Sequence, residues 1–383
     1  MDLDGKGFAT RCVHGFGGSD AATGAVVPPI SLATTFAQDG VGGLAAGFEY
    51  SRSGNPTRAA LESHLAALEG GRHAFAFASG LSAEDALLRL VAPGDHVLIP
   101  DDAYGGTFRL AVRVHAPTGL EVDPIDLTDL DAVRAAWRPN TRMVWIETPT
   151  NPLLRIVDIE AVAAIAHDHD AVVVVDNTFA TPALQQPLAL GADVVVHSST
   201  KYLGGHSDVV GGAVVLDDDG LAERIGFLQN AAGAVPSPFD CYLVMRGART
   251  LDLRMQRHCS SAATVAEALA AHPAVREVLW PGLASHPGHE VAAKQMRGFG
   301  GMVSFCLVGG EPAALDVCRR TEVFTLAESL GAVESLIEHP ARMTHASVAG
   351  TGNAVAGDLV RLSVGIEDPA DLVADLTQAL LGP

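Results

Sequence analysis

The alternation of strand-like and helix-like segments constrains the fold of this chain more than any other feature. From about Ala74 onward, short β-rich runs are separated by longer amphipathic segments, such as those opened by Ser82 and Asp158. The strand-like runs read AFAFASG, HVLIPDDAYGG, RMVWIETPTN, AVVVVDNTF, DVVVHSSTK and GGAVVLDDD. Such alternation predicts an α/β fold whose mainly parallel sheet is covered by helices on both faces.

Changes in pattern along the 383 residues predict three parts. Residues 1–51 are rich in Gly, Ala, Thr and Pro with weak periodicity, which indicates an extended N-terminal arm of the kind that packs on a neighbouring subunit. Residues 52–245 hold the alternating segments and predict a large domain. Residues 246–383 are first helical and then less regular, which predicts a smaller C-terminal α+β domain.

Charge and cysteine usage exclude several classes of partner. The net charge of −20 would repel phosphate backbones and anionic lipid, so we expect no nucleic-acid or membrane-surface partner. No stretch of 18 or more apolar residues is present, and the N-terminus does not resemble a signal peptide. The five cysteines are scattered and form no C-x-x-C pair, which indicates reduced thiols and a cytoplasmic protein.

Polar residues follow several of the predicted strands. In open α/β sheets, ligands bind beyond the carboxyl ends of the strands, so these residues are candidates for one site. They offer a phosphate-sized nest, an aromatic ring, carboxylates and a lysine between hydroxyls. In chain order the candidates are Ser79, Gly80, Leu81, Tyr104, Glu147, Asn151, Asp176, Ser198, Thr200 and Lys201.

Lys201 is one of only three lysines among 25 basic residues. Pyridoxal phosphate needs a lysine for its Schiff base, an acid for its pyridinium nitrogen, a ring to stack on and donors for its phosphate. Arginine cannot replace that lysine, because a guanidinium stays protonated. Taken singly, Lys201 could be a solvated lysine, Asp176 a helix cap and Tyr104 a turn residue. Their combination predicts pyridoxal phosphate as cofactor.

Competing motifs are weaker. The HDHD stretch at 167–170 has the composition of a metal site, but a polar turn between a helix and a strand explains it, and we expect no metal. Neither a G-x-G-x-x-G fingerprint after the first strand nor a G-x-x-x-x-G-K-[ST] loop is present. The nicotinamide dehydrogenase and nucleotide hydrolase interpretations therefore lose their main support.

Longer motifs resemble the Cys/Met-metabolism family of pyridoxal-phosphate enzymes. The resemblance spans nearly the whole chain and rests on FEYSRSGNPTR, ASGLSA, DDAYGGTFR, WIETPTNP, VVDNTF, HSSTKYLGGHSDVV, TLAESLG, MTHAS and RLSVGIED. It implies the aspartate-aminotransferase-like fold, PLP fold type I, with residues 52–245 as the cofactor-binding domain.

The resemblance also implies roles for individual residues. Lys201 matches the Schiff-base lysine that shuttles protons, Asp176 the partner of the pyridine nitrogen, and Tyr104 the stacking tyrosine that can also donate a proton. Phosphate contacts are implied for Gly80, Leu81, Ser198 and Thr200, and, across a subunit boundary, for Tyr50 and Arg52. The implied assembly is a homo-oligomer, most simply a homotetramer.

The substrate implied by the resemblance is a small amino acid. Arg361 and Ser329 match the clamp for its α-carboxylate, and Asn151 matches the residue that in this family is near the cofactor's ring hydroxyl and that carboxylate. Glu328 offers a carboxylate to a distal amino group, with a helix cap or surface carboxylate as the plainer explanation.

Among the reactions of this family, we expect γ-elimination from L-cystathionine, giving L-cysteine, 2-oxobutyrate and ammonia. The alternative is the cystathionine γ-synthase reaction, in which cysteine replaces the acyl group of an O-acylhomoserine. A methionine γ-lyase is disfavoured, because YGGT lacks the cysteine expected after the tyrosine-glycine pair. A non-catalytic binding relative is disfavoured because Lys201 and Arg361 are both present.

Overall fold

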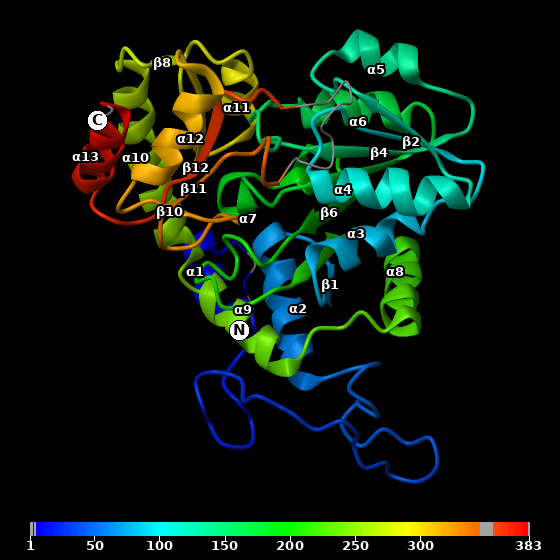
Figure 1. The fold of residues 1–383 in the computed structure, drawn as a ribbon. Coiled ribbons are helices and arrows are strands. Elements are labelled where there is room, and N and C mark those ends of the chain that lie inside the picture. The colour runs from blue at the N-terminus through cyan, green and yellow to red at the C-terminus, as the bar shows by residue number, and fades with distance from the viewer. Residues whose placement is uncertain (1–2, 4, 345–354, 382–383) are drawn as a thin grey trace.

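The computed structural model describes residues 3, 5–344 and 355–381, and its largest element is a seven-stranded sheet (Figure 1). β7 runs antiparallel to both of its neighbours, and the other pairs are parallel. The predicted α/β fold with a mainly parallel sheet is confirmed. In spatial order the strands are β1 (His73–Phe77), β7 (Gly212–Leu216), β6 (Val194–His197), β5 (Val172–Asp176), β4 (Thr141–Glu147), β2 (His96–Pro100) and β3 (Glu121–Ile125).

Helices cover both faces of this sheet because its strands are apolar on both sides. On β5, Val174 packs toward α3 and α8, whereas Val173 and Val175 pack toward α5 and α6. Helices of the first face are α3 (Gly80–Leu88), α4 (Gly105–Arg109), the π-helix η1 (Leu110–His115) and α8 (Asp219–Ala232). Those of the second face are α5 (Leu130–Ala136), α6 (Ile159–His167) and, against β1 and β7, α2 (Pro56–Glu69).

Three short helical segments lie in connections within this layer, and a helix pair leads from it to the rest of the chain. The short segments are η2 (Ala116–Thr118), α7 (Thr181–Leu184) and η3 (Pro187–Leu190). The pair consists of α9 (Pro238–Ala248), which packs on α2, and α10 (Leu251–Ala270). The predicted division at residue 246 falls within α9 and stays a prediction.

The C-terminal part forms a second, five-stranded sheet with its own core. Helices α10, α12 and α13 pack on it and bury Phe305, Ile337 and Leu362. In spatial order its strands are β10 (Thr325–Leu326), β11 (Leu336–Glu338), β12 (Leu359–Ser363), β9 (Met302–Leu307) and β8 (Val275–Leu279). The remaining helices are α11 (His289–Gln295), α12 (Gly310–Arg320) and α13 (Pro369–Leu380).

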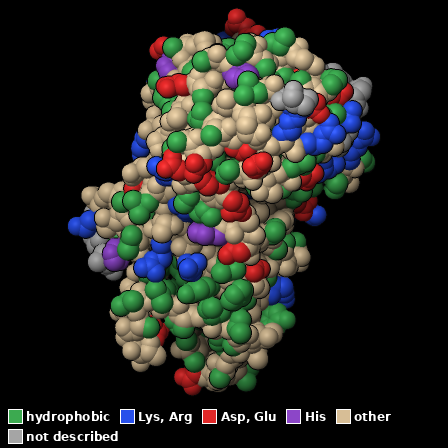
Figure 2. All heavy atoms as spheres, turned by 60° about the vertical axis from the view of Figure 1, so that its left-hand side comes forward, with side chains coloured by type: hydrophobic (Ala, Val, Ile, Leu, Met, Phe, Trp, Pro, Cys, Tyr) green, Lys and Arg blue, Asp and Glu red, His purple; other side chains and the backbone are tan. Residues whose placement is uncertain are grey.

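The N-terminal segment leaves the body of the molecule. After α1 (Phe8–His14), residues 15–55 form neither helices nor strands and extend below the sheets (Figure 1). Val26 and Leu32 on this segment are 79% and 72% exposed. Figure 2 shows hydrophobic side chains gathered over the lower part of one face, and Figure 1 places the segment at that end of the molecule. An apolar surface of this kind suits contact with another chain.

None of the helices within residues 3, 5–344 and 355–381 is long and apolar enough to cross a membrane.

Candidate active site

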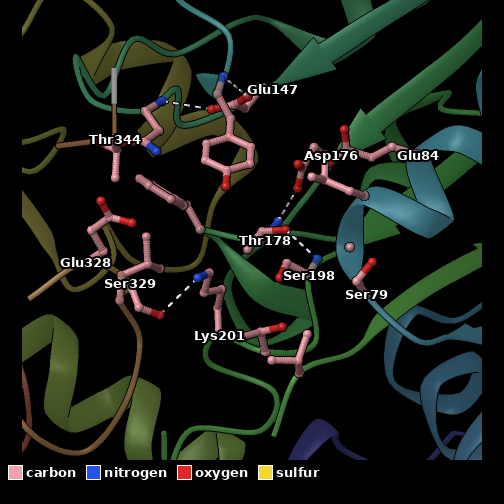
Figure 3. A pocket seen from close by; sticks show the side chains of 18 of the residues that line it. Ser79, Glu84, Glu147, Asp176, Thr178, Ser198, Lys201, Glu328, Ser329 and Thr344 are labelled. Atoms are coloured by element: carbon pink, nitrogen blue, oxygen red, sulfur yellow. Dashed lines mark hydrogen bonds between the residues drawn. The ribbon is translucent and has the colours of Figure 1, made fainter. Parts of the chain in front are cut away.

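A cavity of about 300 Å³ lies at the carboxyl ends of β4, β5 and β6 (Figure 3). Its walls come from the strand ends of the large sheet, the first turn of α3, and the 328–330 loop and β12 of the smaller sheet. Most of the residues predicted for cofactor or substrate line it. They are Lys201, Tyr104, Asp176, Gly80, Leu81, Ser198, Thr200, Arg361, Ser329, Asn151 and Glu328.

Glu147 and Asp176 are brought together by strand register. They are paired residues at the ends of β4 and β5. Side chains alternate along a strand, so Glu147 follows Trp145, and Asp176 follows Val174, onto the face covered by α3. Two carboxyl groups therefore meet at the same edge of the sheet.

Burial separates the roles of these two acids. Glu147 accepts hydrogen bonds from the backbone N–H groups of Tyr104 (2.9 Å) and Asn151 (2.8 Å), which braces both loops. Desolvation, and then the charge of Asp176, raise the pKa of Glu147 well above its usual value. Burial also raises the pKa of Asp176, but hydrogen bonds that Thr178 donates to this carboxylate oppose the rise. Asp176 is therefore the acid better suited to carry the negative charge.

Lys201 lies in the turn after β6, and its side chain reaches into the cavity. The Nζ atom donates a hydrogen bond to Ser329 Oγ over 2.9 Å (Figure 3). Burial, and then the nearby Arg361 guanidinium, lower the pKa of the amine to about 8, while Glu338 and Glu328 oppose the shift. An amine with such a pKa has a much larger neutral, nucleophilic fraction near neutral pH than an ordinary lysine.

The first turn of α3 forms an anion-binding wall. Ser79 caps this helix through a capping box with Ser82, and the next N–H groups, those of Gly80 and Leu81, begin the helix at the cavity. A Cβ atom on Gly80 would lie 2.9 Å from the Cβ atom of Ser198, so only glycine fits there. The Thr200 hydroxyl already has partners, because it exchanges hydrogen bonds with the backbone of Gly211.

Tyr104 stands at the start of α4 with its ring in the cavity. A Cβ atom on Gly106 would lie 2.3 Å from the ring, so the glycine after Gly105 makes room for it. Burial, followed by the charge of Glu84, raises the pKa of the phenol. Tyr104 therefore keeps its proton at neutral pH and is suited to donate it.

Arg361 projects from β12 and is 2% exposed. Its guanidinium donates to the side-chain oxygen of Asn151 (2.7 Å) and to the backbone oxygen of Ser329 (2.8 Å), and it pairs with Glu338 at 3.0 Å. Ser329 has a φ of 93°, a strained value for a residue other than glycine. The predicted clamp residues are thus in contact with one another.

Glu328 lies at the exposed rim of the cavity, near Thr344 (Figure 3). The Thr344 hydroxyl donates a 2.9 Å hydrogen bond to Glu338. The MTHAS motif continues from Thr344 into residues 345–347, which lie outside the described residues.

Tyr50 and Arg52 do not line this cavity. Arg52 is exposed, donates 2.7 Å hydrogen bonds to the backbone and side-chain oxygens of Asn230, and lies over the ring of Tyr50. Their assignment to the phosphate of an adjacent subunit stays a prediction.

The sequence analysis assigned no role to several residues of the cavity and clamp, among them Glu84, Thr178 and Glu338. Thr178 follows Asp176 closely, so the strand-end rule could have included it. Glu84 lies in a helix and Glu338 on a short strand paired with Arg361, and no local motif marks either one.

The histidines of the HDHD stretch have ordinary partners. His167 contacts Asp193 at 3.1 Å, and the ring of His169 stacks on Trp137. Within the described parts of the chain, no group of three or more His, Cys, Asp or Glu side chains is arranged to hold a metal ion.

The donor set of the cavity fits pyridoxal phosphate. The first turn of α3 offers backbone donors and has no room for a Cβ atom at Gly80, which suits a phosphate. Across the cavity, Asp176 offers a buried carboxylate to a ring nitrogen, and Lys201 an amine of lowered pKa to an aldehyde. All of these groups line the same cavity.

Comparison with known proteins gives a consistent result. The family model described as Cys/Met metabolism PLP-dependent enzyme matches residues 9–381. Cystathionine γ-synthase of Mycobacterium tuberculosis is 64% identical over 376 residues, covering 98% of this chain and 97% of that protein. Cystathionine β-lyase of Lactococcus lactis is 53% identical (97% and 98% covered), and cystathionine γ-lyase of Dictyostelium discoideum 50% (97% and 97%). The crystal structure of metB from Corynebacterium glutamicum superposes with a TM-score of 0.98 at 52% identity, covering 100% and 99% of the two chains.

Proposed function

The chain belongs to the Cys/Met metabolism family of PLP-dependent enzymes, and within it we propose that the main reaction is γ-replacement, in which cysteine displaces the acyl group of an O-acylhomoserine to form cystathionine. The observation that carries this proposal is the greater identity to the γ-synthase than to either lyase. γ-Elimination from cystathionine, which the sequence analysis favoured, becomes the second candidate, since one cavity of this kind could serve both reactions.

The α-carboxylate of the substrate would bind at Arg361. The planar guanidinium can donate two parallel hydrogen bonds to a carboxylate. Its orientation is fixed by the hydrogen bonds that it donates to Asn151 and Ser329. Glu338 neutralises this buried cation until a substrate carboxylate arrives.

Lys201 would hold the cofactor and move protons. Bound pyridoxal phosphate supplies an electron sink that makes the substrate's Cα and Cβ protons acidic. The freed Lys201 amine, whose pKa is lowered by burial, would remove the Cα proton, pass that proton on toward the cofactor, and then remove a Cβ proton. Ser329 keeps the freed amine at the cavity wall.

The exchange at Cγ would take place on the open side of the cavity. The Cγ–O bond breaks, the acyl group departs as a carboxylate, and a Cγ–S bond forms to the cysteine sulfur, whose proton is released. The buried phenol of Tyr104 keeps its proton and can assist the departing oxygen. Glu328 at the rim offers its carboxylate to the ammonium group of the incoming cysteine.

We further propose a cytoplasmic homotetramer in which Tyr50 and Arg52 of each subunit complete the phosphate site of a neighbour. Support comes from the N-terminal segment, which carries exposed apolar residues away from the body of its own chain (Figure 1).

A partition experiment tests the proposed reaction. The enzyme is supplied with an O-acylhomoserine at a fixed concentration while the cysteine concentration is raised, and cystathionine and 2-oxobutyrate are both measured. We expect 2-oxobutyrate to fall as cystathionine rises, because the cysteine sulfur bonds to Cγ before the four-carbon unit that remains after acyl loss is released and hydrolysed. If 2-oxobutyrate stays the main product at saturating cysteine, the proposal is wrong.

A further inference from the structure

Glu84 is a buried acid that none of the roles above uses. It lies on α3, is 4% exposed, and lines the cavity. Within the part of the chain that the structure describes, its Oε2 atom has no hydrogen-bond partner. An ionised carboxylate left unpaired inside a protein is costly, so such a residue calls for a functional explanation.

The position of Glu84 connects it to the cofactor site. Figure 3 shows its side chain extending from α3 toward Asp176, at the end of the cavity opposite Ser329. Burial and then the charge of Asp176 raise the pKa of Glu84 well above its usual value, and only the Thr107 hydroxyl opposes the rise. Burial without a counter-charge therefore favours the protonated form of the Glu84 side chain.

Few other charged groups face Glu84. Tyr104 does so from the loop before α4, and its phenol is itself neutral. Glu147 faces Asp176 from β4. Arg109 on α4, Arg113 on η1 and Glu223 on α8 belong to elements packed against α3, but they are exposed. The other charged groups on α3 and its neighbours have partners of their own, and they are Asp85 with His115 and Arg89, His197 with Glu69, His73 with Asp219, and Arg224 with the Leu90 carbonyl.

We propose that Glu84 is a proton-linked residue of the cofactor site, protonated in the cofactor-free protein and giving up its proton to solvent when the pyridine ring binds beside Asp176. Glu84 acts on the cofactor through Asp176, and the proposal rests on the Asp176 assignment made above. It does not depend on which reaction the enzyme favours.

The physical reason is charge compensation. A protonated pyridine nitrogen would bring a positive charge beside Asp176, and its attraction for the Glu84 carboxylate would offset the repulsion from the Asp176 carboxylate. The affinity of Glu84 for its proton is then lower in the cofactor-bound protein than in the free protein. At a pH between the pKa of Glu84 in the cofactor-bound protein and its pKa in the free protein, binding releases a proton. In that range the cofactor affinity rises by up to about tenfold per pH unit.

Proton release can be counted without any measurement of activity. Pyridoxal phosphate is titrated by calorimetry into cofactor-free protein, in two buffers of different ionisation enthalpy, for the wild type, Glu84→Gln and Glu84→Met. The two variants lack the titratable proton, and the contribution of Lys201 cancels in the difference. Glu62→Gln is the matched control, because burial also raises the pKa of Glu62 but this residue lies on α2, outside the cavity.

We expect the wild type and Glu62→Gln to release up to about one proton per site more than either Glu84 variant. In the wild type, cofactor binding should also remove an infrared band of a protonated carboxyl group, and this loss should be absent from the Glu84 variants. A loss that persists in those variants would belong to Glu147, whose pKa burial also raises. Equal proton counts for the wild type and a folded Glu84 variant, or an unchanged carboxyl band, would overturn it.

Asp176→Ala separates failure of this proposal from failure of the assignment beneath it. If Asp176→Ala binds the cofactor with the wild-type spectrum and proton count, Asp176 is not the partner of the ring nitrogen. If Asp176→Ala changes both while the Glu84 variants change neither, only the Glu84 proposal fails.

Discussion

The amine of Lys201 donates a 2.9 Å hydrogen bond to the hydroxyl of Ser329, which joins a turn of the large sheet to a loop of the smaller one. The backbone oxygen of Ser329 also accepts a hydrogen bond from Arg361. One strained residue therefore contacts both the amine proposed to move protons and the cation proposed to hold the substrate carboxylate. The relative position of the two sheets sets the geometry of the site.

Lys201→Ala should abolish turnover and the visible absorption band of the lysine-bound cofactor, which borohydride reduction removes in the wild type. Neither of the other lysines can take over, because Lys294 is exposed and bonded to Glu160, and Lys6 lies in the N-terminal segment outside the cavity. Lys294→Ala is the matched control and should keep both properties. A Lys201→Ala protein with turnover and an intact band would refute the cofactor assignment.

Lys201→Met should stabilise the cofactor-free protein at pH 7. Folding lowers the pKa of Lys201 from 10.5 to about 8, so the unfolded chain binds more protons between these values and stability rises with pH across that range. Below pH 8 the folded protein carries the full free-energy cost of burying the charged amine, which is on the order of 3 kcal/mol. Urea unfolding of the wild type and Lys201→Met at pH 7 and pH 10 measures this cost. The gain in free energy of unfolding caused by the substitution should be smaller at pH 10. An equal gain at both values would contradict the shift.

Glu338→Gln should destabilise the substrate-free protein by about 3 kcal/mol, because it leaves the buried Arg361 guanidinium without its counter-charge. An α-carboxylate ligand supplies the missing charge, so the ligand should raise the melting temperature of the variant more than that of the wild type. Glu322→Gln, on the surface, is the control. A variant as stable as the wild type would show that Glu338 does not neutralise Arg361.

Much of the cavity could be predicted from the sequence because the carboxyl ends of parallel strands meet at one edge. Asp176, Lys201 and Tyr104 each follow a strand-like run, and the rule that places ligands beyond such ends needs no knowledge of strand order. The fold followed from the same alternation, since short apolar runs separated by amphipathic segments have few other solutions.

Other parts of the site depend on packing that local sequence does not report. Glu84 meets Asp176 only because α3 crosses the face of the sheet on which Asp176 ends. Glu338 meets Arg361 through the antiparallel register of β11 and β12, which a three-residue strand does not reveal. The partner of Arg52 within its own chain, Asn230, is 178 residues away, and its proposed target lies on another chain.

Arg52→Ala should weaken cofactor affinity while changing the free energy of unfolding of the subunit by less than about 0.5 kcal/mol, since the side chain is exposed. If Arg52 acts on a neighbour, mixing Arg52→Ala and Lys201→Ala subunits should restore activity, because some sites then have both wild-type residues. Arg134→Ala, exposed on α5, is the control. No recovery on mixing, or a fully active monomer in sedimentation, would contradict the shared site.

The most direct measurement is a comparison of two specificity constants on one preparation of the wild-type enzyme. The first is kcat/KM for cystathionine formation from an O-acylhomoserine at saturating cysteine, and the second is kcat/KM for release of 2-oxobutyrate from cystathionine. We predict that the first exceeds the second by at least about tenfold, equivalent to about 1.4 kcal/mol of transition-state stabilisation. A larger constant for 2-oxobutyrate release would contradict γ-replacement and establish γ-elimination as the main reaction.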